Sequence, residues 1–223
     1  MIISHKKKFI FIHIPKTAGS SVTNILNPYG RFVDRIVYKY WITQKILFKS
    51  FSFFKLGNAI EKLTGFHKHA YSSTVKDRIS DSIFESYYKF AFVRNPYDWL
   101  TSLYFYIKEH PEHYLHQKVN NLDFEKFIMY QIHENNLVTQ SRYVCNSDGK
   151  LLVNYTAKFE MLQEECNYLS KTLNIKREQI PVINKTKIRN KQYKDLFTPA
   201  IYKEVNNHFH MDFVLFGYEK EKV

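Results

Sequence analysis

The sequence predicts a single α/β domain over residues 1–223, with a central parallel sheet flanked by helices in a P-loop-like arrangement. Two strand–turn–helix units carry this prediction. The first is FIFIHIPKTAGSS, Phe9–Ser21, and the second is FAFVRNPYDWL, Phe90–Leu100. Two such units in one chain favour a parallel sheet, because each helix returns the chain to the same edge. The 223 residues suffice for one sizeable core, and no Gly-rich or Pro-rich linker divides them.

The first unit opens with an apolar run that predicts a buried, central strand. This run, Phe9–Ile14, is rich in aromatic and β-branched residues and stops at Pro15. Ser20 or Ser21 is expected to cap the helix that follows, which should end near Asn27. A tight turn before a helix points several backbone N–H groups at one place, where the helix dipole adds positive potential. The turn therefore predicts a phosphate site.

The turn differs from an ATP-binding loop in two ways. The Walker pattern places its Lys after the second Gly, whereas here Lys16 precedes Gly19, the only Gly of this turn. In addition, no apolar strand ends in an Asp suited to hold Mg²⁺, since Asp77, Asp81 and Asp98 lie in polar or turn contexts. We therefore expect a phosphate held by Lys, Arg and hydroxyl groups, without a metal.

The second unit predicts another cation at the same sheet edge. Phe90–Val93 reads as a strand, Pro96 suits the first position of a helix, and Arg94 lies in the turn between them. Open α/β sheets bind ligands at the carboxyl ends of their strands, and Arg pairs well with phosphate. Two cationic turns at one edge indicate a ligand with phosphates at two places. Further predictions are helices over Phe124–Ile132, Met161–Leu173 and Pro199–Phe209, a strand over Ile180–Ile183 and an apolar end over Phe213–Tyr218.

A basic and apolar segment, residues 38–63, separates the two units. Five lysines are interleaved with Trp, Phe, Ile and Leu in this segment. Such a pattern is typical of amphipathic helices packed on a sheet, and this is the favoured interpretation. A helix in peripheral contact with a membrane surface is the alternative.

Three segments together resemble the sulfotransferase family 2. They are HIPKTAGSS (His13–Ser21), FAFVRNPYDWLTSLYFY (Phe90–Tyr106) and DFVLFGY (Asp212–Tyr218), in the right order over nearly the whole chain. This family includes bacterial sulfotransferases, whose single-domain members are the closest in size, and the animal heparan sulfate 2-O-sulfotransferases. The resemblance implies an enzyme that transfers a sulfuryl group from 3′-phosphoadenosine 5′-phosphosulfate (PAPS) to a carbohydrate hydroxyl.

The resemblance also assigns the donor-binding residues. Arg94 and Ser102 are the residues implied at the 3′-phosphate. Lys16 would neutralise the charge that develops on the leaving 5′-phosphate. The basic loop that contains Lys185 and Thr186 resembles a family segment that closes over the donor. The residues implied at the 5′-phosphosulfate are Lys16, Thr17, Ala18, Gly19, Ser20 and Ser21.

The catalytic base is expected between the two donor motifs. Heparan-type enzymes carry a His-x-His pair there, and its second His acts as base. In this chain the interval contains FHKHA, so the resemblance assigns the base to His69 and its neighbour to His67, with Lys68 where those enzymes have Gly. A surface histidine in a basic loop is the alternative for either residue. His13, inside the first strand, is expected to be a buried histidine with its hydrogen bonds satisfied.

The formal net charge of +12 indicates an anionic partner. We expect an acidic or lipid-linked carbohydrate acceptor, contacted by residues 38–68 and by Asn120–Arg142. A family-typical Gln falls at Gln140, where it could touch the acceptor or the donor. Two alternatives stay open: a P-loop-type kinase or NTPase, and a non-enzymatic binder of anionic polymers. Nucleic acid is not expected, because the aromatic residues fall at core spacings and no RNA-binding signature is present.

The cysteines and the N-terminal residues predict a cytoplasmic protein, and residues 38–63 leave association with a membrane open. Cys145 and Cys166 lack metal-ligand spacing and are expected to be free thiols in a reducing compartment. The basic start of the chain leads into only a short apolar run without a cleavage site, unlike a signal peptide. The sequence does not indicate an oligomeric state.

Overall fold

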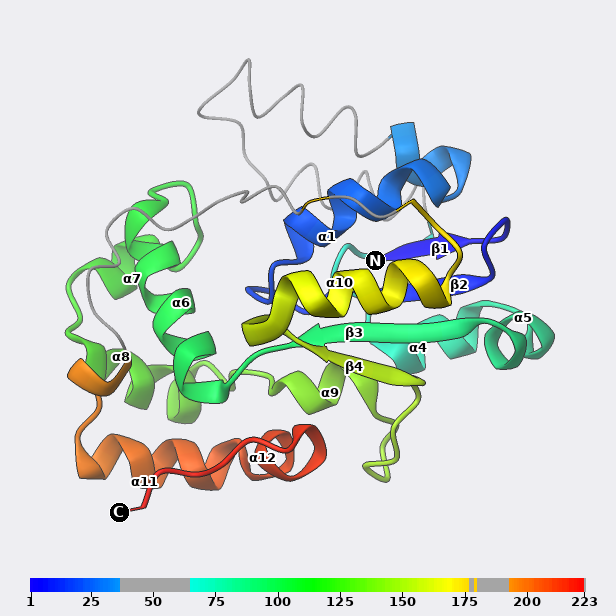
Figure 1. The fold of residues 1–223 in the computed structure, drawn as a ribbon. Coiled ribbons are helices and arrows are strands. Elements are labelled where there is room, and N and C mark those ends of the chain that lie inside the picture. Colours follow the sequence, from blue (N-terminus) through cyan, green and yellow to red (C-terminus); the bar gives the residue numbers. More distant parts are fainter. Residues whose placement is uncertain (37–64, 177–178, 180–192, 223) are drawn as a thin grey trace. The chain divides into compact units, whose positions relative to one another are not determined.

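A four-stranded sheet organises the fold, as shown in Figure 1. The structure is a computed structural model, and it describes residues 1–36, 65–176, 179 and 193–222. The strands lie in the order β1 (Ile2–Ser4), β2 (Phe9–Ile12), β3 (Tyr88–Val93) and β4 (Tyr155–Lys158). β2, β3 and β4 are parallel, which confirms the predicted central parallel strands. β1 pairs antiparallel with β2 and makes the sheet mixed, a feature that the sequence did not predict.

The chain divides into two compact units. The first, Met1–Val93 with Arg142–Ile183, contains the sheet, and the second, Arg94–Ser141 with Asn184–Val223, is helical where it is described. The expected single domain over residues 1–223 stays a prediction. The bounds of α9, Gln140–Val144, cross the border between the units.

One face of the sheet is covered by two helices of the first unit, α1 (Gly19–Leu26) and α10 (Leu162–Thr172). Side chains alternate along a strand, so Phe9 and Phe11 of β2 share this face and pack with helix residues such as Val22 and Leu169. Ile10 points to the opposite face and is equally buried, so both faces are covered, as parallel strands require. The other helical elements of this unit are η1 (Asn27–Tyr29), α4 (Ser72–Arg78), α5 (Asp81–Ser86) and η3 (Phe159–Met161).

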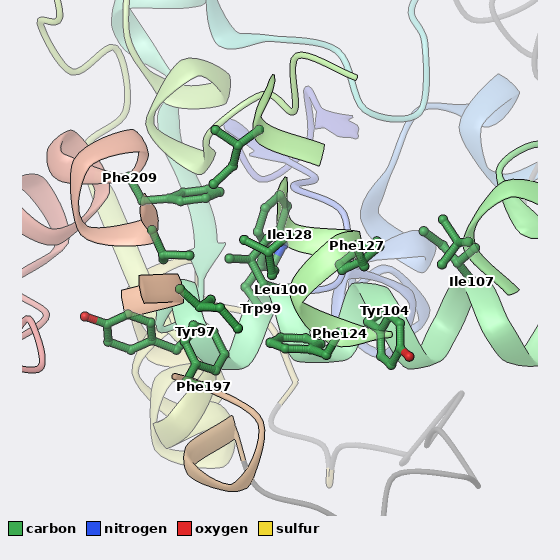
Figure 2. Close-up of a cluster of buried hydrophobic side chains, with 14 of the residues drawn as sticks. Tyr97, Trp99, Leu100, Tyr104, Ile107, Phe124, Phe127, Ile128, Phe197 and Phe209 are labelled. Carbon is green, nitrogen blue, oxygen red and sulfur yellow. The ribbon is translucent and has the colours of Figure 1, made fainter. Parts of the chain in front are cut away.

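The helical unit is built on α6 (Pro96–Glu109). Pro96 occupies its first turn as predicted, and the Asn95 side chain accepts a hydrogen bond from the Tyr97 N–H. Figure 2 shows the core of this unit, in which apolar residues of α6 pack against aromatic residues of the other helices. Each large apolar side chain that is buried in this way stabilises the unit by about 1.5–3 kcal/mol. These other helices are α7 (His116–Asn120), α8 (Phe124–Met129), the π-helix η2 (Tyr130–Glu134), η4 (Tyr193–Asp195), α11 (Pro199–His208) and α12 (His210–Phe216).

The predicted helices are confirmed with shifted ends. Phe124–Ile132 is α8 followed by the π-helix η2, Met161–Leu173 is α10, and Pro199–Phe209 is α11. The apolar end over Phe213–Tyr218 contains the second half of α12. The expected strand over 180–183, the segment 38–63 and the two loop residues Lys185 and Thr186 lie outside the described residues. Among the helices that are described, none has the length and apolar character needed to cross a membrane.

Candidate active site

The turn after β2 has an unusual backbone that suits an anion. Lys16 and Ala18 both adopt left-handed conformations, with φ of 64° and 61°, whereas Thr17 between them does not. Such alternation turns successive N–H groups toward one side and makes a concavity that binds anions. A left-handed residue other than Gly costs about 1–2 kcal/mol, and strain of this kind concentrates at functional sites. The Thr17 hydroxyl donates to the Ile14 carbonyl at 2.9 Å and closes the turn.

Helix α1 starts at Gly19 with no side-chain cap. The expectation that Ser20 or Ser21 caps it is therefore wrong, because both serines already lie within the first helical turn. The residue before the helix is Ala18, which has no side chain that could accept a hydrogen bond. A helix start that lacks such a cap presents N–H groups and a positive dipole end to an anionic group.

Gly19 is required by the close approach of a histidine ring. A Cβ placed on Gly19 would lie 1.7 Å from Nε2 of His13, so the ring occupies the space that any other residue would need. His13 is buried, as expected, but its Nδ1 has no hydrogen-bond partner among the described residues. The expectation that the hydrogen bonds of His13 are satisfied is thus wrong. The histidine instead fills the space between the strand end and the helix start.

His69 lies against His13 in a fixed orientation. Its Nδ1 is 2.8 Å from the main-chain oxygen of His13, and the two ring centroids are 4.5 Å apart. A carbonyl oxygen only accepts, so Nδ1 must carry the proton and Nε2 is left with the lone pair. His67 accepts a hydrogen bond through its Nδ1 from the backbone N–H of His69, at 3.1 Å, and so stabilises the local turn. This geometry suits His69 to proton abstraction at Nε2.

The surroundings keep His69 neutral. Burial lowers its pKa well below 6.5 and the charge of Lys68 adds to this, although the hydrogen bond to His13 opposes both. Burial also lowers the pKa of His13, with His69 and Lys68 adding to the effect. A neutral imidazole can accept a proton at physiological pH, which a general base must do.

These two histidines should make the fold sensitive to mild acid. Their folded pKa values lie below 6.5, so the unfolded chain binds more protons than the folded chain as pH falls below that value. Their contribution to the free energy of unfolding should be complete above pH 6.5 and should fall progressively below it. Urea unfolding between about pH 7.5 and pH 5 measures this, and His69→Gln, which removes one of the two groups, should reduce the pH slope. Equal slopes for both proteins would contradict this account of His69.

The second predicted turn holds its cation by an ion pair. Arg94 directly follows β3 and is buried, and its Nε donates to Asp98 at 2.6 Å, while Nη2 contacts the same carboxylate. Asp98 thus orients the guanidinium. Ser102, further along α6, is 5% exposed. Lys185 and Thr186, the other expected donor contacts, lie outside the described residues.

Gln140 and Asp212 are joined to this turn by buried hydrogen bonds. The sequence suggested that Gln140 could touch the acceptor or the donor. Its side-chain amide instead bonds to the main chain of Arg94. The Asp212 carboxylate in turn accepts from the backbone N–H groups of Gln140 and Ser141. The sequence assigned Asp212 no role, although it is the first residue of the motif DFVLFGY. Over the described ranges, no group of three or more His, Cys, Asp or Glu side chains is placed to hold a metal ion.

The family model described as the sulfotransferase family matches residues 1–219. The chain belongs to the sulfotransferase family. This confirms the resemblance drawn from the three motifs and makes the protein a sulfuryl transferase. Sulfotransferases of this family generally use PAPS as the sulfate donor. A search of curated proteins and a search of solved structures found no match to this sulfotransferase.

Proposed function

We propose that this sulfotransferase transfers a sulfuryl group from PAPS to a hydroxyl of an acidic carbohydrate, with His69 as the general base. The observation that carries the proposal is the fixed tautomer of His69, whose Nδ1 hydrogen bond to the His13 main chain leaves Nε2 as the basic atom. His13 is on the same strand-to-helix connection as the anion-binding turn, three residues before Lys16. The base and the phosphate-binding turn are thereby held by one short stretch of chain.

The donor-binding residues fit the chemistry of PAPS. The left-handed residues of the turn and the helix start without a side-chain cap supply backbone N–H donors, and Lys16 supplies a full charge. We propose that these groups, with the hydroxyls of Ser20 and Ser21, bind the 5′-phosphosulfate. Arg94 and Ser102 bind the 3′-phosphate in this proposal. PAPS itself supplies the activated sulfuryl group and a phosphate leaving group.

The residues of the chain then have distinct tasks during transfer. Nε2 of His69 takes the proton of the acceptor hydroxyl while its oxygen forms the new bond to sulfur. The Nδ1 hydrogen bond to His13 stabilises the imidazolium that results. Lys16 and the backbone N–H groups stabilise the negative charge that develops on the leaving phosphate as its bond to sulfur breaks. The products are a sulfate ester and 3′,5′-ADP, and the proton on His69 passes to solvent.

Ligand-induced stabilisation tests the donor site. At a 3′,5′-ADP concentration a hundred times Kd, wild-type protein should gain about 2.7 kcal/mol of stability, whereas Lys16→Ala should gain little at the same concentration. Lys76→Ala is a matched control, because Lys76 is a lysine of the same unit that forms, among the described residues, one long ion pair of 4.0 Å with Glu85. Thermal unfolding with each ligand measures the shift. Stabilisation by ATP with Mg²⁺ but not by 3′,5′-ADP would instead support a kinase or NTPase.

An exposed cation that contacts Tyr71, close to the base in sequence, supports an acidic acceptor. The guanidinium carbon of Arg142 lies 5.8 Å from the centroid of the Tyr71 ring, and this ring packs at 4.9 Å on that of Tyr143. Tyr71 is two residues beyond His69, so their Cα atoms are within about 7 Å of each other. In the parts of the chain that are described, no carboxylate forms an ion pair with Arg142. We propose that Arg142 pairs with a carboxylate or sulfate group of the acceptor.

Replacement of Arg142 should weaken acceptor binding selectively. We expect Arg142→Gln to raise KM for a uronic acid oligosaccharide about tenfold, as loss of a charge-assisted hydrogen bond implies. The KM for PAPS should not change, and neither should the KM for the carboxyl-reduced oligosaccharide. Lys171→Gln, on the exposed side of α10, serves as the charge-matched control. Equal loss with the acidic and the reduced oligosaccharide would contradict the role of Arg142.

The cellular setting is part of the proposal. Cys145 and Cys166 are buried thiols that form no disulfide among the described residues, which fits a reducing cytoplasm. We propose a cytoplasmic enzyme that sulfates an acidic or lipid-linked glycan, with peripheral membrane contact through residues 38–63. A non-enzymatic binder of anionic polymers would retain such a glycan but would not consume PAPS, so turnover separates the two.

A further inference from the structure

The turn after β3 is held by a single glutamine side chain. The backbone N–H of Arg94 donates to Oε1 of Gln140 at 2.9 Å, and Nε2 of Gln140 donates to the Arg94 carbonyl at 2.7 Å. One amide thus satisfies both main-chain groups of Arg94, as a neighbouring strand would. Gln140 is fully buried and 46 residues away in the sequence. Its amide is therefore engaged by the protein and not aimed at a ligand.

A buried carboxylate holds this glutamine in turn. Oδ2 of Asp212 accepts from the Gln140 N–H at 2.9 Å, and Oδ1 accepts from the Ser141 N–H at 2.7 Å. These are the first two residues of α9, so the carboxylate caps that helix from 72 residues away in the sequence. Asp212 is itself fully buried. Its two oxygens fix the position of the main chain from which the Gln140 side chain extends.

The side chain of Arg94 is fixed by a separate contact. Asp98 binds its Nε at 2.6 Å and contacts Nη2, whereas Gln140 binds only its main chain. The two partners therefore act on different parts of Arg94. Gln140 fixes the position of its main chain, and Asp98 fixes the direction of its guanidinium. Loss of either partner of a buried hydrogen bond leaves a polar group unsatisfied. We therefore expect the main chain of the Arg94 turn to change its position when Gln140 is replaced.

We propose that Gln140 and Asp212 are positioning residues that place Arg94 for the 3′-phosphate of the donor. The proposal rests on the proposed function, in which Arg94 binds this phosphate. It gives the C-terminal motif DFVLFGY a role in donor selection, through the chain of contacts from Asp212 to Gln140 to Arg94. The first turn, which would bind the 5′-phosphosulfate, has no part in these contacts.

The proposal predicts a specific change in ligand preference. Wild-type protein should bind 3′,5′-ADP more tightly than 5′-AMP, which lacks only the 3′-phosphate. In Gln140→Met and Asp212→Asn, the affinity for 3′,5′-ADP should fall at least about tenfold, the effect of losing about 1.4 kcal/mol. The affinity for 5′-AMP should stay within about twofold, because its phosphate is bound by the first turn. Titration calorimetry, with competition for the weaker ligand, measures both constants.

Two further variants keep the test decisive. Gln140→Glu retains the volume and the oxygen that faces the Arg94 N–H, so it reports on the same contact if the apolar variant does not fold. Gln131→Met is the matched control, since Gln131 is another fully buried glutamine of the helical unit and bonds to Asn135. This control should keep the wild-type preference.

The outcomes separate the two proposals. Loss of the preference in the Gln140 and Asp212 variants, with the control unchanged, supports their positioning role. An unchanged preference, or an equal fall in affinity for both nucleotides, overturns it. A wild-type protein that binds both nucleotides equally would overturn the role of Arg94 in the proposed function itself.

Discussion

Replacing His69 by Ala should lower kcat for sulfuryl transfer by about 10²–10⁴-fold, the usual contribution of a general base. The Nε2 lone pair is the atom that would take the acceptor proton, and Ala removes it. The donor should still bind, because the backbone N–H groups and Lys16 do not depend on this side chain. Steady-state kinetics with PAPS and an acidic oligosaccharide measure the loss, and 3′,5′-ADP titration checks donor binding.

The His67→Ala variant is the control for this substitution. His67 is exposed and its Nδ1 accepts from the backbone N–H of His69, so it has no proton to take from the acceptor in this account, and its loss should cost much less than the loss of His69. Because burial lowers the pKa of His69, wild-type kcat/KM should also persist below pH 6.5 before it declines. Full activity of the His69→Ala protein would remove this residue from the base role.

Gly19→Ala should destabilise the sheet unit and weaken donor binding. The added Cβ would meet Nε2 of His13 at 1.7 Å, so either the ring or the start of α1 must move. Overpacking of this kind typically costs about 1–3 kcal/mol. Since α1 presents its first N–H groups to the donor, a shift of its start should also raise the Kd for 3′,5′-ADP. Urea unfolding and ligand titration of the same preparation measure the two effects.

A double-mutant cycle attributes the cost to the clash. In a His13→Ala background the space beside Gly19 is open, so the same Gly19→Ala change should then cost far less. The main-chain oxygen that binds His69 is retained in that background. The coupling free energy between the two positions should fall within the 0.5–3 kcal/mol range of directly contacting residues. Additive costs would show that His13 is not what requires a glycine here.

The sequence predicted the parts of the fold that short segments determine. β2 and β3 were predicted because each is an apolar run, and the start of α6 was predicted because Pro96 suits the first turn of a helix. β1 and β4 were missed. β1 has only three residues, and β4 has four, of which Ala157 alone is buried, so neither carries a strong pattern of its own. Their place in the sheet depends on pairing with β2 and β3, which a local pattern does not reveal.

The candidate site shows the same division. The phosphate-binding character of the first turn could be predicted from its residue types, but the missing serine cap depends on the left-handed conformation of Ala18. The tautomer of His69 depends on a carbonyl 56 residues away, and the position of Arg94 depends on Gln140, 46 residues away. Contacts of this kind have no local pattern, so only the structure could assign them.

Transfer of radiolabelled sulfate from PAPS to an acidic oligosaccharide tests the central claim most directly. Wild-type protein in the presence of a metal chelator should form the sulfate ester and 3′,5′-ADP in equal amounts. His69→Ala should bind 3′,5′-ADP as tightly as wild type but form product at about a hundredth of the rate or less. A wild-type protein that binds the oligosaccharide and leaves PAPS unconsumed, or a His69→Ala protein that transfers sulfate at the wild-type rate, would contradict the account.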